Sequence, residues 1–250
     1  MNVCLSSAGR RVALLDCFRR AMQGLGLDGR ISVVDSSRSA PTFHLADAAW
    51  QVPPCTTPEF IPTMLELCRR ERIGLVVPTI DTELAAYADH RDEFAAAGVT
   101  VLVSGPQTIG IAADKVLTHS WLTENGFPTV RQAMPEEVTS HPDRWRFPLI
   151  AKPRGGSAGA GVVCARSVEA LQLAAGERGD LVVQEIAPGC EYTVNLYLDQ
   201  RGRCRCAIPH RRLEVRAGEV SKAITVRHEG LMSMATRGAE ALPQARGALN

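Results

Sequence analysis

The stretch FPLIAKPRGGSAGAGVVCA, residues 147–165, combines a predicted strand, a lysine and a glycine-rich loop. The strand ends at Lys152, and the loop that follows contains Gly155, Gly156, Gly159 and Gly161. Glycine at this density allows positive φ angles and lets backbone N–H groups approach the oxygens of a phosphate. The loop is not a Walker A motif, because no GK[ST] closes it and a strand follows where a helix would be expected. On these residues alone, a phosphate-binding loop and a flexible hairpin both fit the sequence.

A second stretch, LVVQEIAPGCEYTVNLYLD at residues 181–199, predicts two strands joined by a Pro-Gly bend. The backbone of such a hinge can offer N–H and C=O groups to the edge of an adenine ring. Glu191 follows Glu185 at a distance of six residues, and its carboxylate can accept hydrogen bonds from both hydroxyls of a ribose. Taken separately, each acidic residue is more often just the solvated end of a strand.

Residues 1–110 alternate short apolar runs with amphipathic stretches, the pattern of strands and helices around a parallel sheet. The predicted strands are 3–6, 31–35, 75–78 and 99–103, and the predicted helices are 60–72 and 83–97. Ligands of such open α/β units tend to bind at the carboxyl ends of the strands. The glycine fingerprint GxGxxG is absent from the first strand-to-helix turn, SSAGRR at 6–11, which favours a plain turn over a dinucleotide site.

Residues 111–250 predict a second domain with an antiparallel sheet. Asp114 is suited to cap a helix and Gly126 to end it. The stretch 135–146 predicts a surface loop or a short helix. The predicted strands 148–152, 162–165, 181–185 and 192–198 are close enough in sequence to suggest one antiparallel sheet, with a helix at 167–175.

Composition excludes several classes of protein. The chain has 250 residues, 45% of them apolar, and a net charge of +1, which gives no general reason to expect a nucleic-acid or anionic-membrane partner. No stretch approaches the roughly 20 apolar residues of a membrane span, and the N-terminus does not read as a signal sequence, so we expect a cytoplasmic protein. The eight cysteines contain no CxxC pair and are expected to be buried free thiols. Cys204 and Cys206 would share one face of a strand, but they lack the further ligands of a zinc site.

The order and approximate spacing of these features resemble the ATP-grasp superfamily, and in particular its carbamoyl-phosphate-synthase-like group. The resemblance rests on Lys115, Lys152, the glycine loop, the hinge at 184–187 and Glu191. It extends over nearly the whole chain, because SAGRR at 7–11, LADAAWQVPP at 45–54 and VVPTIDTEL at 76–84 resemble the pre-ATP-grasp domain of that group. The implied fold is a Rossmann-like α/β pre-ATP-grasp domain over residues 1–110, followed by an α+β ATP-grasp domain with an antiparallel sheet over residues 111–250.

The resemblance also implies roles for individual residues. Lys115 and Lys152 would contact the phosphates of ATP, Glu191 would hold the ribose, and Lys152 would also be catalytic. The mobile lid over the phosphates would be formed by Gly155, Gly156, Ser157, Gly159 and Gly161, and the border of the adenine site by Gln184, Glu185 and Ala187.

Two basic residues in RRLEVRAGEVSKAITV, 211–226, are further catalytic candidates by resemblance. Arg216 and Lys222 would face the γ-phosphate or the carboxylate of the substrate. Solvated side chains on polar strands are the alternative interpretation for both.

The implied activity is that of an ATP-dependent ligase. Such enzymes phosphorylate a small carboxylate substrate and let an amine or a thiol displace phosphate from the acylphosphate, forming C–N bonds in the amine case. The implied cofactors are ATP and Mg²⁺, and a homodimer is one candidate assembly. The metal ligands are unknown, because the Glu-x-Asn element of relatives has no counterpart before RGALN at 246–250, where the ATP-grasp domain looks incomplete.

Two other functions fit the sequence less well. The chain could be a non-catalytic nucleotide-binding module or an inactive fragment, which would bind ATP without turning it over. It could also carry the dinucleotide-binding domain of an oxidoreductase, but the missing glycine fingerprint argues against that class.

Overall fold

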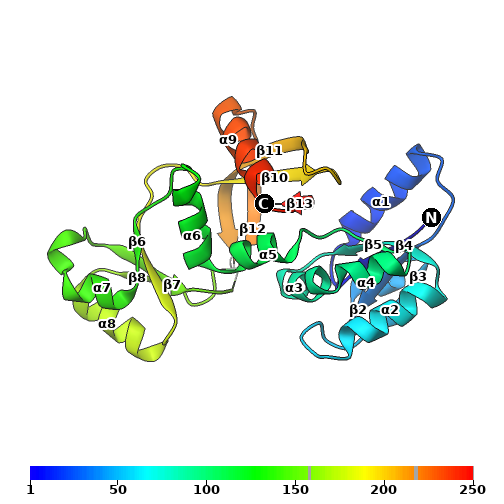
Figure 1. Cartoon of the computed structure of the whole chain (residues 1–250), viewed down its shortest axis with the longest axis horizontal. Coiled ribbons are helices and arrows are strands. Elements are labelled where there is room, and N and C mark those ends of the chain that lie inside the picture. The colour runs from blue at the N-terminus through cyan, green and yellow to red at the C-terminus, as the bar shows by residue number, and fades with distance from the viewer. Residues whose placement is uncertain (157–158, 217–218, 250) are drawn as a thin grey trace. The chain divides into compact units, whose positions relative to one another are not determined.

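Figure 1 shows the computed structural model of the chain, which describes residues 1–156, 159–216 and 219–249. The chain forms two compact units. Unit 1 contains Met1–Ile109, with Leu198–Gly202 and Pro243–Ala248 returning to it. Unit 2 contains Gly110–Tyr197 and Arg203–Leu242.

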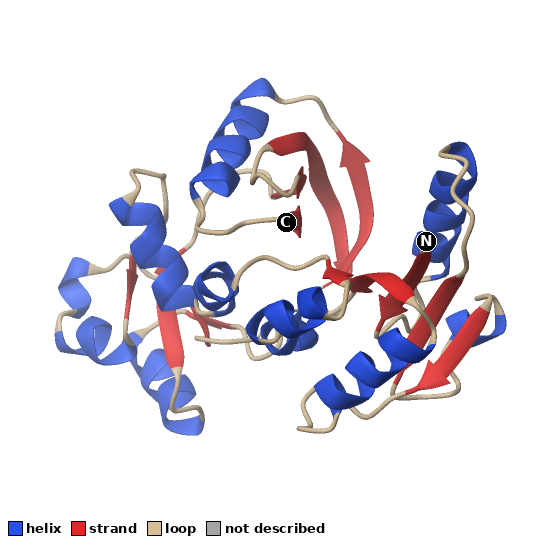
Figure 2. Cartoon of the chain, turned by 45° about the vertical axis from the view of Figure 1, so that its right-hand side comes forward, coloured by secondary structure: helices blue, strands red, loops and turns tan. Residues whose placement is uncertain are grey.

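Unit 1 is built on a five-stranded sheet in the order β3-β2-β1-β4-β5, in which the paired strands run parallel. The strands are β1 Asn2–Ser6, β2 Ile31–Asp35, β3 Ala48–Gln51, β4 Ile73–Pro78 and β5 Thr100–Val101. The helices are α1 Val12–Gly24, η1 Pro41–His44, α2 Phe60–Arg70, α3 Asp81–Asp89, α4 Arg91–Ala96 and α5 Pro106–Ala113. Figure 2 shows these strands and helices by colour, and unit 1 has the expected α/β character.

The core of unit 1 explains why α2 is a helix. Its buried residues are Phe60, Ile61, Met64, Leu65, Leu67 and Cys68. They recur at the spacing of one helical face and pack against the strands of the sheet. Tyr87 and Phe94 belong to the same cluster, and their rings meet edge to face with centroids 5.5 Å apart.

Two predictions for unit 1 differ from the structure. The expected helix 83–97 is divided at His90, whose backbone leaves the helical conformation at φ −106° and ψ 11°. The His90 ring nitrogen Nδ1 lies 2.9 Å from the Ala86 carbonyl oxygen, so the side chain bonds the end of the first segment. The expected strand 99–103 is reduced to Thr100–Val101.

The described residues also form two four-stranded sheets. The first has the order β6-β9-β7-β8, with β6 Gln132–Ala133, β7 Leu149–Pro153, β8 Val163–Ala165 and β9 Leu181–Glu185. The second has the order β12-β11-β10-β13, with β10 Tyr192–Leu198, β11 Cys204–Arg216, β12 Glu219–Thr225 and β13 Gly247–Leu249. The helices are α6 Lys115–Glu124, α7 Pro135–Ser140, η2 Pro142–Arg144, α8 Val168–Glu177 and α9 Glu229–Ala241. Together with the parallel sheet of unit 1, these antiparallel sheets confirm the predicted fold class.

The grouping of strands in unit 2 differs from the prediction of a single antiparallel sheet. β10 leaves the sheet of β7, β8 and β9 and joins the second sheet. The segment 186–191 explains the change, because it has no regular structure and contains Pro188 and a left-handed Gly189 at φ 106°. This segment turns the chain from one sheet into the other.

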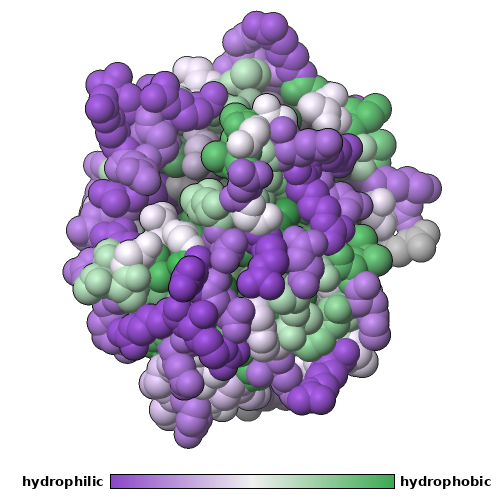
Figure 3. Space-filling model, turned by 90° about the vertical axis from the view of Figure 1, so that its right-hand side faces the viewer, coloured by the Kyte–Doolittle hydropathy of each residue, from purple (hydrophilic) through white to green (hydrophobic). Residues whose placement is uncertain are grey.

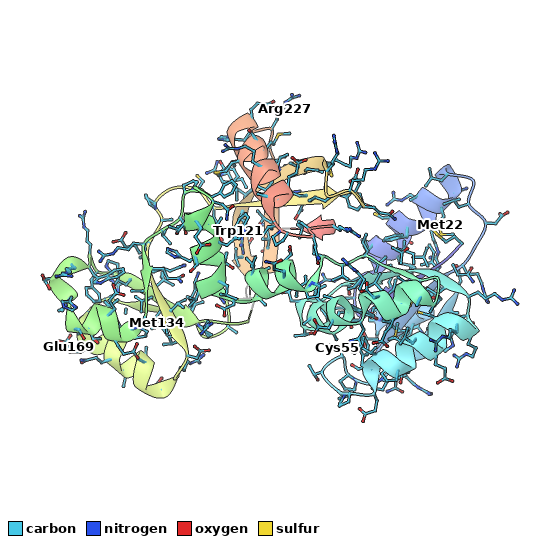
Figure 4. All side chains as sticks on the ribbon, in the orientation of Figure 1. Met22, Cys55, Trp121, Met134, Glu169 and Arg227 are labelled. Carbon is cyan, nitrogen blue, oxygen red and sulfur yellow. The ribbon has the colours of Figure 1, made fainter. Side chains whose placement is uncertain are left out.

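Local signals in unit 2 work as predicted. The Asp114 side chain caps α6 by accepting hydrogen bonds from the backbone N–H groups of Val116 and Leu117. The Trp121 ring on α6, labelled in Figure 4, stacks on Phe127 with centroids 5.5 Å apart. Gly126 lies just beyond the helix in the left-handed region, at φ 70°.

The cysteines correct the prediction of buried thiols. Only Cys4 and Cys68 are buried, Cys55 (labelled in Figure 4) and Cys204 are half-buried, and Cys17, Cys164, Cys190 and Cys206 are exposed. All eight are free thiols. An apolar run predicts a strand but not the face of each side chain, and Cys164 on β8 points away from the side on which Ala165 is buried.

The surface is largely hydrophilic on the face that Figure 3 shows, with apolar side chains in small separate groups. Within the described ranges, no helix has both the length and the apolar content needed to cross a membrane.

Candidate functional site

The glycine loop starts where β7 ends. β7 pairs with β9 so that Lys152 lies opposite Val182, which sets its half-buried side chain at the entrance to the loop. Gly156, Gly159 and Gly161 have φ angles of 85°, 68° and 76°, values that only glycine adopts at little cost. Ser157, which was expected to belong to the lid, lies outside the described residues.

Close packing also requires glycine at position 161. A Cβ atom there would lie 2.9 Å from Cγ of Pro153 and would clash with Nη1 of Arg178. Arg178 follows α8, so its guanidinium brings a further positive charge to the end of the loop. The sequence pattern does not indicate a role for Arg178, because this residue lies between predicted elements.

Lys115, at the start of α6, contacts the same loop. Its Nζ donates to the carbonyl oxygens of Gly156 at 3.0 Å, Gly155 at 3.2 Å and Arg154 at 3.4 Å. Its backbone N–H also donates to the Arg154 carbonyl oxygen at 3.0 Å. The structure therefore brings Lys115 and the glycine loop together across about 40 residues of sequence. The spacing of these residues in the sequence could not by itself establish this contact.

An ion pair fixes the base of the loop. Nη2 of Arg154 lies 2.6 Å from Oδ2 of Asp114, and Nε donates to the same oxygen at 2.8 Å. The hydrogen bond from Arg154 is the main reason why the pKa of Asp114 is lowered. Asp114 thus caps α6 and anchors the first loop residue at once, a second role that the sequence did not reveal.

Lys115 and Lys152 form a positively charged site in which both pKa values are lowered. Burial lowers the pKa of Lys152, and the charge of Lys115 lowers it further. Burial also lowers the pKa of Lys115, against the opposing effect of Asp114. An anion placed beside both ammonium groups would raise both pKa values, so the site favours a ligand with concentrated negative charge.

Gln184, one of the residues predicted to border the adenine, is linked to Lys115 through the side-chain amide of Gln132. Nε2 of Gln184 on β9 donates to Oε1 of Gln132 at 2.6 Å, and Nε2 of Gln132 donates to the Lys115 carbonyl oxygen at 3.2 Å. The backbone N–H of the neighbouring residue Glu185 donates to the Arg131 carbonyl oxygen at 3.1 Å. Ala187 lies in the irregular segment that follows β9. Gln132 was missed because β6 is only two residues long.

The carboxylate of Glu191 is held by an arginine. Oε1 of Glu191 lies 2.9 Å from Nη1 of Arg212 on β11, and the Arg212 backbone N–H donates to the Glu191 carbonyl oxygen at 2.9 Å. The side chain of Glu191 remains 65% exposed, whereas Nε of Arg212 is buried and has no hydrogen-bond partner within the described parts of the chain. Arg212 therefore orients the Glu191 carboxylate, while the side chain as a whole remains largely exposed.

The two later basic candidates lie on the β11 and β12 hairpin. Nζ of Lys222 lies 3.1 Å from Oε2 of Glu214 on the neighbouring strand, and the Lys222 side chain is 71% exposed. This ion pair is not a contact with the glycine loop. Arg216 ends β11, but its side chain lies outside the described residues.

Among the described residues, no group of three or more His, Cys, Asp or Glu side chains is arranged to hold a metal ion. Mg²⁺ is commonly held by one or two carboxylates together with substrate phosphates, an arrangement that does not need such a group.

Comparison with known families places both parts of the chain. Residues 3–102 match the PylC-like N-terminal domain, and residues 112–249 match the ATP-grasp domain. The chain is thus a two-domain protein of the ATP-grasp class, with an N-terminal domain of the PylC-like type. It belongs to the ATP-grasp family. Among curated proteins, none matches the sequence.

Solved structures share the fold at low sequence identity. The biotin carboxylase domain of 2-oxoglutarate carboxylase from Hydrogenobacter thermophilus, solved with MgADP, ADP and bicarbonate, is 18% identical with a TM-score of 0.74, over 98% of this chain and 59% of that one. N5-carboxyaminoimidazole synthetase from Staphylococcus aureus, solved with ADP, is 15% identical with a TM-score of 0.73, over 98% and 63%. L-amino acid ligase from Bacillus licheniformis is 16% identical with a TM-score of 0.72, over 99% and 61%. The chain spans less than two thirds of the length of these structures.

Proposed function

We propose that this chain binds ATP at the glycine loop and serves an ATP-dependent ligase that activates a carboxylate as an acylphosphate. The observation that carries the proposal is the meeting of Lys115 Nζ with the loop after Lys152, where the charge of one lysine lowers the pKa of the other. Triphosphate is a ligand that supplies an anion to this site. Membership of the ATP-grasp family and the ADP complexes among the similar structures support this choice of nucleotide.

Each part of the site has a proposed role. Lys115 and Lys152 neutralise the phosphates, and glycines of the loop supply backbone N–H groups and cover them. Glu191 binds the ribose hydroxyls through the carboxylate that Arg212 orients. The adenine lies against Gln184, Glu185 and Ala187. Arg216 and Lys222 are proposed contacts of the γ-phosphate or the substrate carboxylate, and for Lys222 this contact requires release from Glu214.

The proposed reaction has two steps. A carboxylate oxygen of the substrate attacks the γ-phosphorus in line, the bond to the β–γ bridging oxygen breaks, and ADP leaves with that electron pair. An amine or thiol then attacks the acyl carbon, the bond to the phosphate oxygen breaks, and phosphate leaves while the nucleophile loses its proton. The chain's own contribution is to hold the phosphates, offset their charge with two lysines and exclude water by closing the loop. No step is assigned to a metal.

Calorimetric titration with a non-hydrolysable ATP analogue tests nucleotide binding. Lys152→Ala removes a charge-assisted contact worth about 1.5 to 3 kcal/mol, which corresponds to roughly ten- to hundredfold weaker binding. Arg227→Ala is the matched control, because Arg227 belongs to the same unit, is 84% exposed and pairs only with the exposed Glu229 in the described structure. Equal affinities for the parent protein and Lys152→Ala would refute the site.

A second measurement separates binding from chemistry. ATP labelled with ¹⁸O at the β–γ bridge is incubated with a panel of carboxylates, and migration of the label to a non-bridging position reports reversible acylphosphate formation. Label migration that requires a carboxylate and disappears in Lys152→Ala supports the ligase. Tight nucleotide binding without migration by the natural full-length product would refute the ligase and leave a nucleotide-binding module.

A further inference from the structure

Unit 1 contains a pocket that the proposed nucleotide site does not use. Its volume is about 520 Å³, and the residues that line it include Arg38, Phe43, Trp50, Glu66 and Arg70. All of them belong to unit 1, whereas the residues proposed to bind ATP lie in unit 2. The volume falls within the range of about 300 to 1,000 Å³ that is usual for small-molecule sites.

The pocket lies beside the edge of the parallel sheet. β3 is the terminal strand of that sheet and contributes Trp50, while η1 contributes Phe43 and α2 forms the opposite wall. Both aromatic rings are half-buried and pack on the core, which fixes them as apolar surfaces of the pocket. The site therefore offers a rigid apolar surface to the body of a ligand.

Two guanidinium groups line the same pocket. Nε of Arg38 donates to Oε1 of Gln51 at 2.9 Å, and Nε2 of Gln51 donates to the Ser36 carbonyl oxygen at 2.9 Å, so Arg38 is held in place. Nε of Arg70 donates to Oε1 of Glu71 at 2.9 Å. In the described structure these bonds use Nε, so the Nη groups of Arg38 and Arg70 are available to a carboxylate.

Besides Glu71, which pairs with Arg70, a second carboxylate, Glu66, belongs to the pocket lining itself. Glu66 lies one helical turn before Arg70 on α2, and Thr63 lies three residues earlier on the same face of the helix. Where the structure is described, the exposed Glu66 side chain makes no hydrogen bond or ion pair. The pocket thus combines two guanidinium donors, one free carboxylate acceptor and an aromatic wall.

We propose that this pocket binds a free α-amino acid with an aromatic or large apolar side chain. The carboxylate of the amino acid binds Arg38 and Arg70, its ammonium group binds Glu66, and its side chain packs on Trp50 and Phe43. A zwitterion satisfies both signs of charge at once. A phosphate or a simple carboxylic acid would leave Glu66 unpaired beside an anion, and a simple amine would leave the guanidinium groups without a partner.

Calorimetry with L-phenylalanine and L-leucine as probes tests the proposal, with two matched analogues of phenylalanine. Phenethylamine lacks the carboxylate and 3-phenylpropionate lacks the ammonium group, and both are expected to bind at least tenfold more weakly than L-phenylalanine. Glu66→Gln should abolish the preference for L-phenylalanine over 3-phenylpropionate, and Arg38→Ala should reduce the preference over phenethylamine, because Arg70 remains. Lys152→Ala is the control and should leave these affinities unchanged, so failure of the nucleotide proposal would not affect the result.

Tryptophan fluorescence assigns binding to this pocket. The chain has three tryptophans, Trp50, Trp121 and Trp145, of which only Trp50 lines the pocket. In Trp50→Phe the fluorescence response to L-phenylalanine should vanish while the calorimetric affinity stays within a few-fold. Absence of binding of both amino acids to the folded parent protein at millimolar concentration would overturn the proposal. So would affinities that Arg38→Ala and Glu66→Gln both leave unchanged.

Discussion

Replacement of Lys115 by methionine should weaken ATP binding and raise the pKa of Lys152. Methionine keeps the length and apolar stem of lysine but removes the charge. The variant therefore loses the hydrogen bonds of Nζ to the carbonyl oxygens of Arg154, Gly155 and Gly156, at 3.4, 3.2 and 3.0 Å. The hydrogen bond from the backbone N–H of residue 115 to the Arg154 carbonyl oxygen remains. Loss of one charge-assisted phosphate contact should weaken ATP binding by about 1.5 to 3 kcal/mol, roughly ten- to hundredfold.

The second effect concerns Lys152. The charge of Lys115 lowers the pKa of Lys152, so Lys115→Met should raise that pKa toward the ordinary lysine value of about 10.4. Burial, which is the larger cause, remains, so the rise should be partial. ATP binding to the parent protein should move the pKa of Lys152 in the same direction.

Lysine-selective NMR can measure this change directly. The chain has three lysines, Lys115, Lys152 and Lys222, so ¹³C labelling of the ε-carbon gives three signals that single substitutions assign. Lys222→Met is the control and should change neither the titration of Lys152 nor the integrity of the loop. A pKa of Lys152 that stays constant or falls in Lys115→Met would refute the electrostatic coupling, even if ATP affinity decreases.

Three further predictions follow from the same structure. Arg212→Met should release the Glu191 carboxylate and reduce the preference for ATP over 2′-deoxy-ATP several-fold in calorimetry, and an unchanged preference would contradict the positioning role. Gly161→Ala should strain the loop by about 1 to 2 kcal/mol and displace Arg178. The expected results are faster proteolysis of the loop and weaker ATP binding, and a variant with the proteolysis rate and ATP affinity of the parent protein would contradict this prediction. Burial raises the pKa of Glu83 in the folded protein. The protonated Glu83 side chain therefore contributes its full stabilisation at a pH below its unfolded-state pKa, and this contribution is lost as the pH rises through its folded-state pKa. Urea unfolding of Glu83→Gln should show a smaller decline of stability over that interval, although the variant is less stable because four donors surround the carboxylate.

Much of the fold was predictable because it depends on local signals. The strands 31–35, 181–185 and 192–198 have the predicted bounds, and Asp114 caps its helix as expected. Strand grouping was not predictable from proximity in sequence. The bend around Pro188 decides which sheet β10 joins, and only the three-dimensional structure shows its direction.

The candidate site was predictable only for residues that belong to recognisable motifs. Lys115 and Lys152 were found in this way, whereas Gln132 and Arg212 act through partners that lie far away in sequence. Gln132 bonds to Gln184 across 52 residues, and a periodic pattern carries no information about such a contact. The exposed thiols were mispredicted for a related reason, since hydropathy indicates a strand but not the side on which each residue lies.

The lowered pKa values of Lys115 and Lys152 also affect chemical reactivity. A lysine with a lowered pKa has a larger fraction of neutral amine, and the neutral amine is a nucleophile. The proposed acylphosphate would therefore form near two amines that it could acylate. Bound phosphates raise both pKa values and keep the amines protonated, so the nucleotide itself would protect the site from modification by its own intermediate.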